Sequence, residues 1–168
     1  MADASALITL GAVVLGGGVS IAATLAAEAF KHRTTIATRW DADLARHASE
    51  LVATSRRLQH VAGATGGGDD SRDAKHRLDT QHEALRSLAA QVGLLGSFDV
   101  QERARMVVRH AYAVRAVAQG FPDPRQHEYP GLSPNARLID AISEFQAAVR
   151  RQLRIANADD VLDEAQNR

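Results

Sequence analysis

The sequence contains no cysteine, which excludes disulfide bonds, thiolate metal sites and cysteine nucleophiles and leaves the redox compartment open. Aromatic residues make up only 4% of the chain although hydrophobic residues make up 45%. The apolar content is therefore mostly alanine, valine and leucine, which favours helices over sheets. Proline is also scarce: all four prolines lie between Pro122 and Pro134 and mark one loop. No strand pattern of useful length is present, so the sequence predicts an all-α protein.

The chain also lacks an excess of charge of either sign. It has 168 residues, with 20 basic and 20 acidic side chains. A nucleic-acid-binding protein needs a basic face, and this balance gives no support for one. The length suits one domain of ordinary size together with an anchor. We therefore expect no nucleic-acid partner.

A long uncharged segment lies near the N-terminus, between Ala4 and Ala27. As a helix its residues would span about 36 Å, which exceeds the hydrocarbon core of a bilayer at about 30 Å. In water the run Gly16–Gly18 would cost a helix about 1 kcal/mol per glycine. In lipid the backbone has no alternative to internal hydrogen bonds, so the helix tolerates its glycines. The segment predicts a single transmembrane helix, and the bilayer is then the first partner.

The charges that flank this segment predict its orientation. Lys31, His32, Arg33 and Arg39 follow it, and no basic residue precedes it. By the positive-inside rule the N-terminus lies outside the plasma membrane and the C-terminal bulk lies in the cytoplasm. Two alternatives stay open. One is a cleaved signal peptide, weakly suggested by Ala27-Glu28-Ala29, and the other is a buried helix of a soluble protein.

Small residues recur every four positions in the segment and would let two helix backbones approach closely. They predict a helix–helix face in the membrane, and its members are Ala12, Gly16, Ser20 and Thr24.

Four later segments carry apolar residues at alternating steps of three and four, which is the pattern of a one-sided helix. The first stripe is Ala37, Trp40, Leu44, Ala48, Leu51, Ser55, Leu58 and Ala62, and the second is Leu78, Leu85, Leu88, Val92 and Leu95. The third is Val100, Ala104, Val107, Ala111, Val114 and Ala118, and the fourth is Leu138, Ile142, Phe145, Val149 and Leu153. Each stripe needs the others to bury it, so the sequence predicts an antiparallel bundle of about four helices. Trp40 is expected in its core, with a membrane-interface position as the alternative.

Turn and cap residues predict where these helices begin and end. The glycine-rich run Gly63–Asp70 ends the first helix as an exposed turn, and the second begins near Ser71. Gly96 stops the second helix. Either Ser97 or Asp99 caps the third.

Ser133 and Pro134 open the fourth helix as N-cap and first helical residue. The resulting organisation is an N-terminal segment with the transmembrane helix over 1–30, a cytoplasmic helical bundle over 31–157 and a polar tail over 158–168.

We find no set of residues that predicts catalysis. Gly66-Gly67-Gly68 follows no strand and precedes no Gly-Lys-Ser/Thr, so it is not a phosphate loop. His76 and His82 each follow an aspartate by three residues, but we expect them on a solvated face off the leucine stripe. Metal-dependent activity in the bundle is the remaining route to an enzyme. We expect no catalytic residue, cofactor, metal ion or small-molecule substrate.

The segment Gly120–Pro134 is the longest stretch without a helical pattern. It contains Phe121, Tyr129 and all four prolines. Loops on a rigid scaffold carry binding residues more often than the scaffold does. Phe121 and Tyr129 are therefore candidate partner contacts, and the alternative is a packed, structural connection.

The order of these features resembles a set of uncharacterised membrane-anchored helical proteins from actinobacteria. The likeness rests on the uncharged segment, Arg39-Trp40-Asp41, Leu94-Leu95-Gly96-Ser97 and Asp99-Val100. Many of those proteins have proline where this chain has Phe98. The resemblance implies a membrane-anchored helical protein and implies no activity or catalytic residue.

These observations predict a membrane-anchored helical binding or scaffold protein that binds a protein partner or forms a homo-oligomer. The alternative is a small membrane-active protein, such as a phage-type lysis or pore component, that uses the glycine-rich segment.

Overall fold

The computed structural model describes residues 39–64 and 71–155, and these residues form four helices and no strand. Residues 39–64 are helical throughout. The later helices are α2 (Ser71–Leu95), α3 (Phe98–Ala118) and α4 (Pro134–Gln152). The chain divides after Trp40, and the bundle belongs to the unit Asp41–Arg168. The prediction of an all-α helical bundle is confirmed.

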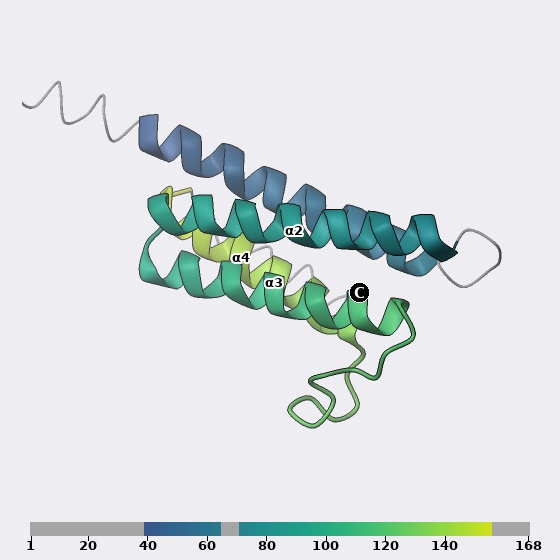
Figure 1. Ribbon diagram of the computed structural model, residues 1–168. Helices are drawn as coiled ribbons and strands as arrows, with labels where there is room; N and C mark the ends of the chain where they lie inside the picture. Colours follow the sequence, from purple (N-terminus) through teal and green to yellow (C-terminus); the bar gives the residue numbers. More distant parts are fainter. Residues whose placement is uncertain (1–38, 65–70, 156–168) are drawn as a thin grey trace, which may run out of the picture. The chain divides into compact units, whose positions relative to one another are not determined.

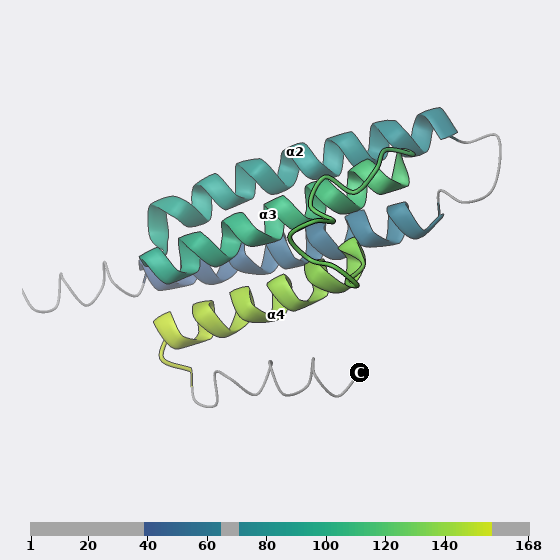
Figure 2. The ribbon, with the colours of Figure 1, turned by 90° about the horizontal axis from the view of Figure 1, so that it is seen from below.

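The helices run alternately up and down. Figures 1 and 2 show α2 and α3 as neighbours joined by a very short connection, with α4 beside α3 and the 39–64 helix on the remaining side. The only residues between α2 and α3 are Gly96 and Ser97. A connection this short leaves no room for a crossover, so the two helices are antiparallel as predicted.

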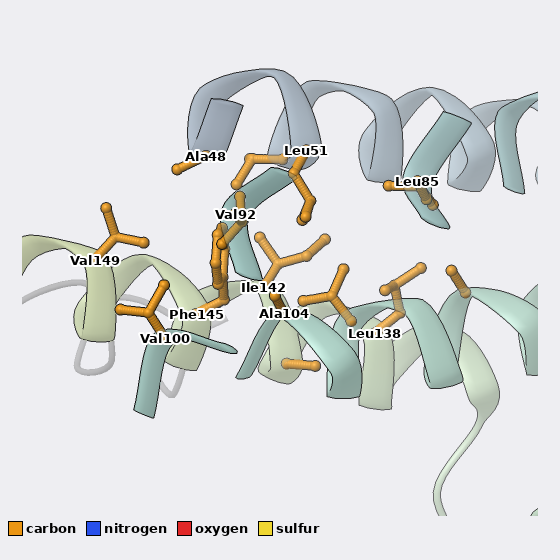
Figure 3. Close-up of a cluster of buried hydrophobic side chains, with 14 of the residues drawn as sticks. Ala48, Leu51, Leu85, Val92, Val100, Ala104, Leu138, Ile142, Phe145 and Val149 are labelled. Atoms are coloured by element: carbon orange, nitrogen blue, oxygen red, sulfur yellow. The ribbon is translucent and has the colours of Figure 1, made fainter. Parts of the chain in front are cut away.

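Each helix contributes its apolar stripe to one core, which Figure 3 shows in part. Leu51, Leu85 and Phe145 are among the fully buried side chains. Ala37 lies outside the described residues, and the other predicted stripe positions are buried or half-buried apart from Trp40. Because each helix is apolar on one face only, the closed arrangement is what removes these faces from water.

Trp40 is not in the core: 54% of its surface is exposed. The prediction of core packing for Trp40 is therefore wrong. Residues 39–43 are all exposed, and Leu44 is the first buried residue of the 39–64 helix.

Two helix boundaries differ in detail from the prediction. The 39–64 helix continues through Gly63 rather than ending there. The helix α3 begins at Phe98 with Ser97 at the N-cap, but the Ser97 side chain makes no cap hydrogen bond. The Ser97 N–H instead donates to Gln152 Oε1 of α4 at 2.7 Å. Asp99 is inside the first turn, where it pairs with Arg151 at 3.2 Å, so it is not the cap.

The remaining boundary predictions are confirmed. The helix α2 ends at Leu95, just before Gly96. Ser133 caps α4, because its Oγ accepts a hydrogen bond from the Ala136 N–H at 3.1 Å, and Pro134 is the first helical residue. Both residues suit their positions. The serine hydroxyl accepts a hydrogen bond from an N–H that has no partner within the helix, and proline has no N–H to leave without a partner.

Several predictions fall outside the described residues. They are the transmembrane segment between Ala4 and Ala27 with its small-residue face Ala12, Gly16, Ser20 and Thr24, the domain boundary at 30/31 and the tail 158–168. Within residues 39–64 and 71–155, no helix is long and apolar enough to cross a membrane.

Candidate partner-binding loop

The loop after α3 begins with a helix cap that fixes the position of Phe121. Gly120 has a φ of 88°, which glycine adopts without strain. The Gly120 N–H donates to the Val117 carbonyl at 3.0 Å and the Phe121 N–H donates to the Ala116 carbonyl at 2.9 Å. This bond pair is a Schellman cap, in which the second residue after the cap usually packs back on the helix. Phe121 takes that place, yet 62% of its surface is exposed.

A buried ion pair holds the middle of the loop against α4. The Arg137 guanidinium donates to Asp123 Oδ2, and the two side chains are only 2% and 7% exposed. Arg137 also donates to the Arg125 carbonyl at 3.3 Å. The second carboxylate oxygen of Asp123 accepts from the Arg125 N–H at 3.0 Å. Asp123 therefore fixes both the shape of the loop and its attachment to the bundle.

Tyr129 is the second anchor of the loop. Its ring meets the edge of His110 on α3, with 5.2 Å between the ring centroids. The guanidinium carbons of Arg137 and Arg125 lie 5.0 and 5.6 Å from the Tyr129 ring centroid, which is cation–π distance. Tyr129 is half-buried by these contacts. Phe121 is the more exposed of the two predicted contact residues, with 62% of its surface in solvent.

Charge around the loop alters the protonation of two groups. Hydrogen bonding to Arg125 lowers the pKa of the exposed Glu128 carboxyl. Burial lowers the pKa of His110, and the charges of Arg137 and Arg125 lower it further. His110 is 3% exposed and is therefore a neutral packing partner for Tyr129 at pH 7.

Apolar surface is exposed at both ends of the loop. Leu132 is 46% exposed before α4, and Val117 is 43% exposed at the end of α3. Val117 also lines a shallow cleft of about 340 Å³ between the ends of α3, α4 and the 39–64 helix. The loop thus combines an interior fixed by polar contacts with Phe121 and Leu132 left in water.

The prediction that His82 faces solvent is wrong. His82 follows Leu78 by four residues and precedes Leu85 by three, so it belongs to the buried stripe of α2 and is 8% exposed. Its ring lies 5.7 Å from the Tyr112 ring. Burial lowers the pKa of His82, and the nearby Arg115 charge lowers it further. Asp79 pairs with Arg115 at 3.3 Å rather than with His82.

His76 is exposed on α2, and His60 is exposed on the 39–64 helix. Across residues 39–64 and 71–155, no three histidine or carboxylate side chains lie close enough to hold a metal ion.

The residues that anchor the loop were not among the sequence candidates. His110 follows Val107 by three residues, so its place on the apolar stripe was the available signal. Arg137 adjoins Leu138, and Asp123 lies between two prolines, which gives no comparable signal. Their pairing spans 14 positions along the chain and depends on the loop folding back on α4.

Comparison with known proteins finds no relative of this chain. No protein-family model, no curated protein and no solved structure matches the chain.

Proposed function

We propose that this chain is a membrane-anchored binding protein whose helical bundle contacts a protein partner through the loop Gly120–Pro134. The observation that carries the proposal is the contrast within that loop. Asp123 and Tyr129 are fixed by buried and half-buried contacts, whereas Phe121 is 62% exposed. A contact side chain on a rigid support loses little conformational freedom on binding, which favours affinity.

The partner surface should offer an apolar pocket. Aromatic side chains that fill such pockets contribute much of the binding energy of protein interfaces. Phe121 provides the aromatic ring, and Leu132 provides further apolar area. A second copy of this chain is one protein that could supply the pocket.

The membrane anchor rests on the sequence. The uncharged segment between Ala4 and Ala27 is followed by Lys31 and Arg33, which favours a cytoplasmic bundle. The exposed Trp40 suits a residue near the membrane interface. Membrane fractionation with alkaline carbonate extraction tests the anchor. The chain should stay in the membrane pellet, and protease added from outside should leave the bundle intact. Release into the supernatant would contradict the anchor.

Site-specific photo-crosslinking tests the binding loop. A photoreactive phenylalanine analogue replaces Phe121 in one variant and Phe98 in another. Phe98 is a matched control because it is 77% exposed and begins α3, whereas Phe121 follows the other end of that helix. We expect a discrete adduct from position 121 and none of the same mass from position 98.

Loop shape provides the second control. Replacing Asp123 by Asn in the position-121 variant removes the charge that holds Arg137, so the adduct should weaken. An adduct of twice the chain mass would identify a homo-oligomer as the partner. Equal labelling at positions 121 and 98, or none at 121, would refute the loop as a binding site.

A further inference from the structure

A groove lies between the 39–64 helix and α4, away from the loop. It encloses about 640 Å³. Its apolar lining includes the exposed Ala53 and the half-buried Leu153, and its polar lining includes Arg56 and Arg57. Among the described residues, no carboxylate pairs with Arg56 or Arg57. The groove therefore combines apolar surface with positive charge.

The chain leaves α4 at this groove. Arg154 has a φ of 56°, the left-handed conformation that glycine usually provides. The Arg154 N–H donates to the Arg151 carbonyl at 3.1 Å and the Ile155 N–H donates to the Arg150 carbonyl at 3.0 Å. This Schellman cap ends the helix and places Ile155 on the groove beside Val149 and Leu153. Whatever follows Ile155 starts at the groove itself.

The sequence after Ile155 has the complementary chemistry. Residues 156–168 contain four acidic side chains, Asp159, Asp160, Asp163 and Glu164, and one basic side chain, Arg168. Ala158, Val161, Leu162 and Ala165 are spaced as one face of a helix. On that helix Asp159 and Glu164 would flank the apolar face, at the positions that meet an arginine rim.

The segment is long enough to follow the groove. Thirteen helical residues, 156–168, extend about 20 Å. The groove follows the 39–64 helix from Ala45 to Arg57, a rise of about 18 Å.

We propose that the acidic segment 156–168 docks as an amphipathic helix in the groove between the 39–64 helix and α4. Its apolar face covers Ala53 and Leu153, and its acidic flanks pair with Arg56 and Arg57. The segment then acts as an intramolecular cover of this second surface, which any external partner would have to displace.

Thiol labelling tests this in the full chain, because the absence of native cysteine makes a single introduced thiol the only one. Ala53→Cys places the thiol on the groove, where Ala53 is exposed among the described residues. Ser87→Cys places a control thiol on the exposed face of α2. A large maleimide reagent reports how accessible each thiol is.

Two changes should uncover the groove. Ending the chain after Ile155, or replacing the four acidic residues by their amides in the full chain, should speed Ala53→Cys labelling about tenfold, the factor equivalent to 1.4 kcal/mol. The same changes should leave Ser87→Cys labelling within about twofold of its starting rate. High salt should act like the amide variant, because it screens the ion pairs. A peptide of residues 156–168 should restore protection to the shortened chain, and a scrambled peptide should not.

An unchanged labelling rate at Ala53→Cys in both tail variants would overturn the proposal. So would protection that persists without the tail and rises with protein concentration, because a second copy would then cover the groove. If shortening speeds both thiols, the bundle has loosened, and the full-length amide variant decides the question. None of these outcomes depends on a partner of Phe121, so this proposal and the proposed function fail separately.

Discussion

At the scale of single residues, the main feature is a cation buried where a four-helix core meets a loop. The Arg137 side chain is 2% exposed and is held by Asp123, a backbone carbonyl and the Tyr129 ring. A buried charge is tolerated only when its partners stay in place. The Asp123–Arg137 contact therefore ties the loop to the core, and its loss should lower the free energy of unfolding of the whole bundle.

Replacing Asp123 by Ala should lower the free energy of unfolding by about 3–5 kcal/mol, because Arg137 is left as an unpaired buried charge. Urea unfolding followed by circular dichroism measures it. As a control, Asp43→Ala removes the exposed Arg46–Asp43 pair and should cost less than about 1 kcal/mol. The double variant Asp123→Ala/Arg137→Met should be more stable than Asp123→Ala. Similar losses for Asp123→Ala and Asp43→Ala would contradict the anchoring role.

Two buried histidines make stability depend on pH. Burial lowers the folded-state pKa of His82 and of His110 below the unfolded value of 6.5. The charges of Arg115 and Arg86 also lower the pKa of His82, and the charge of Glu83 raises it. The charges of Arg137 and Arg125 lower the pKa of His110, and the charges of Glu128 and Asp123 raise it. As pH falls below about 6.5, the unfolded chain takes up protons first, so the bundle loses stability. Above that value both states are neutral at these positions and the effect vanishes.

The measurement is urea unfolding at a series of pH values between about 7.5 and 5.5, a range that brackets the ordinary histidine pKa. His82→Gln and His110→Gln should each flatten the loss of stability toward acid. His76→Gln is the control, because His76 is exposed on the same helix as His82. An equal slope in all three variants would place the acid sensitivity in other groups.

At the scale of helices, the two glycines near the end of α2 have opposite roles. A Cβ on Gly93 would meet nothing within 4 Å, whereas a Cβ on Gly96 would lie 2.7 Å from Val100 Cγ1. Gly96 is needed because the chain turns between α2 and α3 with Val100 packed against it. Its role is close approach of the backbone rather than an unusual φ.

Gly93→Ala should therefore raise the free energy of unfolding by up to about 1 kcal/mol through helix propensity alone. Gly96→Ala should lower it by about 1–3 kcal/mol, because the added methyl group displaces Val100. Thermal melts of the two single variants provide the comparison. A rise in the free energy of unfolding from both substitutions would mean that the α2–α3 connection accommodates the added methyl group at Gly96.

At the scale of the whole molecule, the four described helices share one apolar core. The buried apolar cluster runs from Leu44 to Val149 and draws on all four described helices. The bundle should therefore keep its fold when the predicted membrane segment is removed.

A chain that lacks Met1–Ala29 should stay soluble, helical and cooperatively folded. The expected readouts are a helical circular dichroism spectrum, a single unfolding transition and a monodisperse peak in size-exclusion chromatography. Aggregation, or a gradual melt without a transition, would show that the bundle depends on the removed segment.

The sequence by itself determined the helices, because apolar residues at steps of three and four lie on one face only when the segment is helical. It located the stripes, the Ser133 cap, the Gly96 stop and the one long loop, and it singled out Phe121 and Tyr129. Those features depend on neighbours a few positions away along the chain.

Only the tertiary structure decided which polar residues are enclosed. The Asp123–Arg137 pair, the His110–Tyr129 contact and the burial of His82 each need two segments to meet. The same holds for Trp40, whose apolar character predicted burial although 54% of its surface is exposed. Periodicity fixes the face on which a side chain lies, but burial depends on what another part of the chain places against that face.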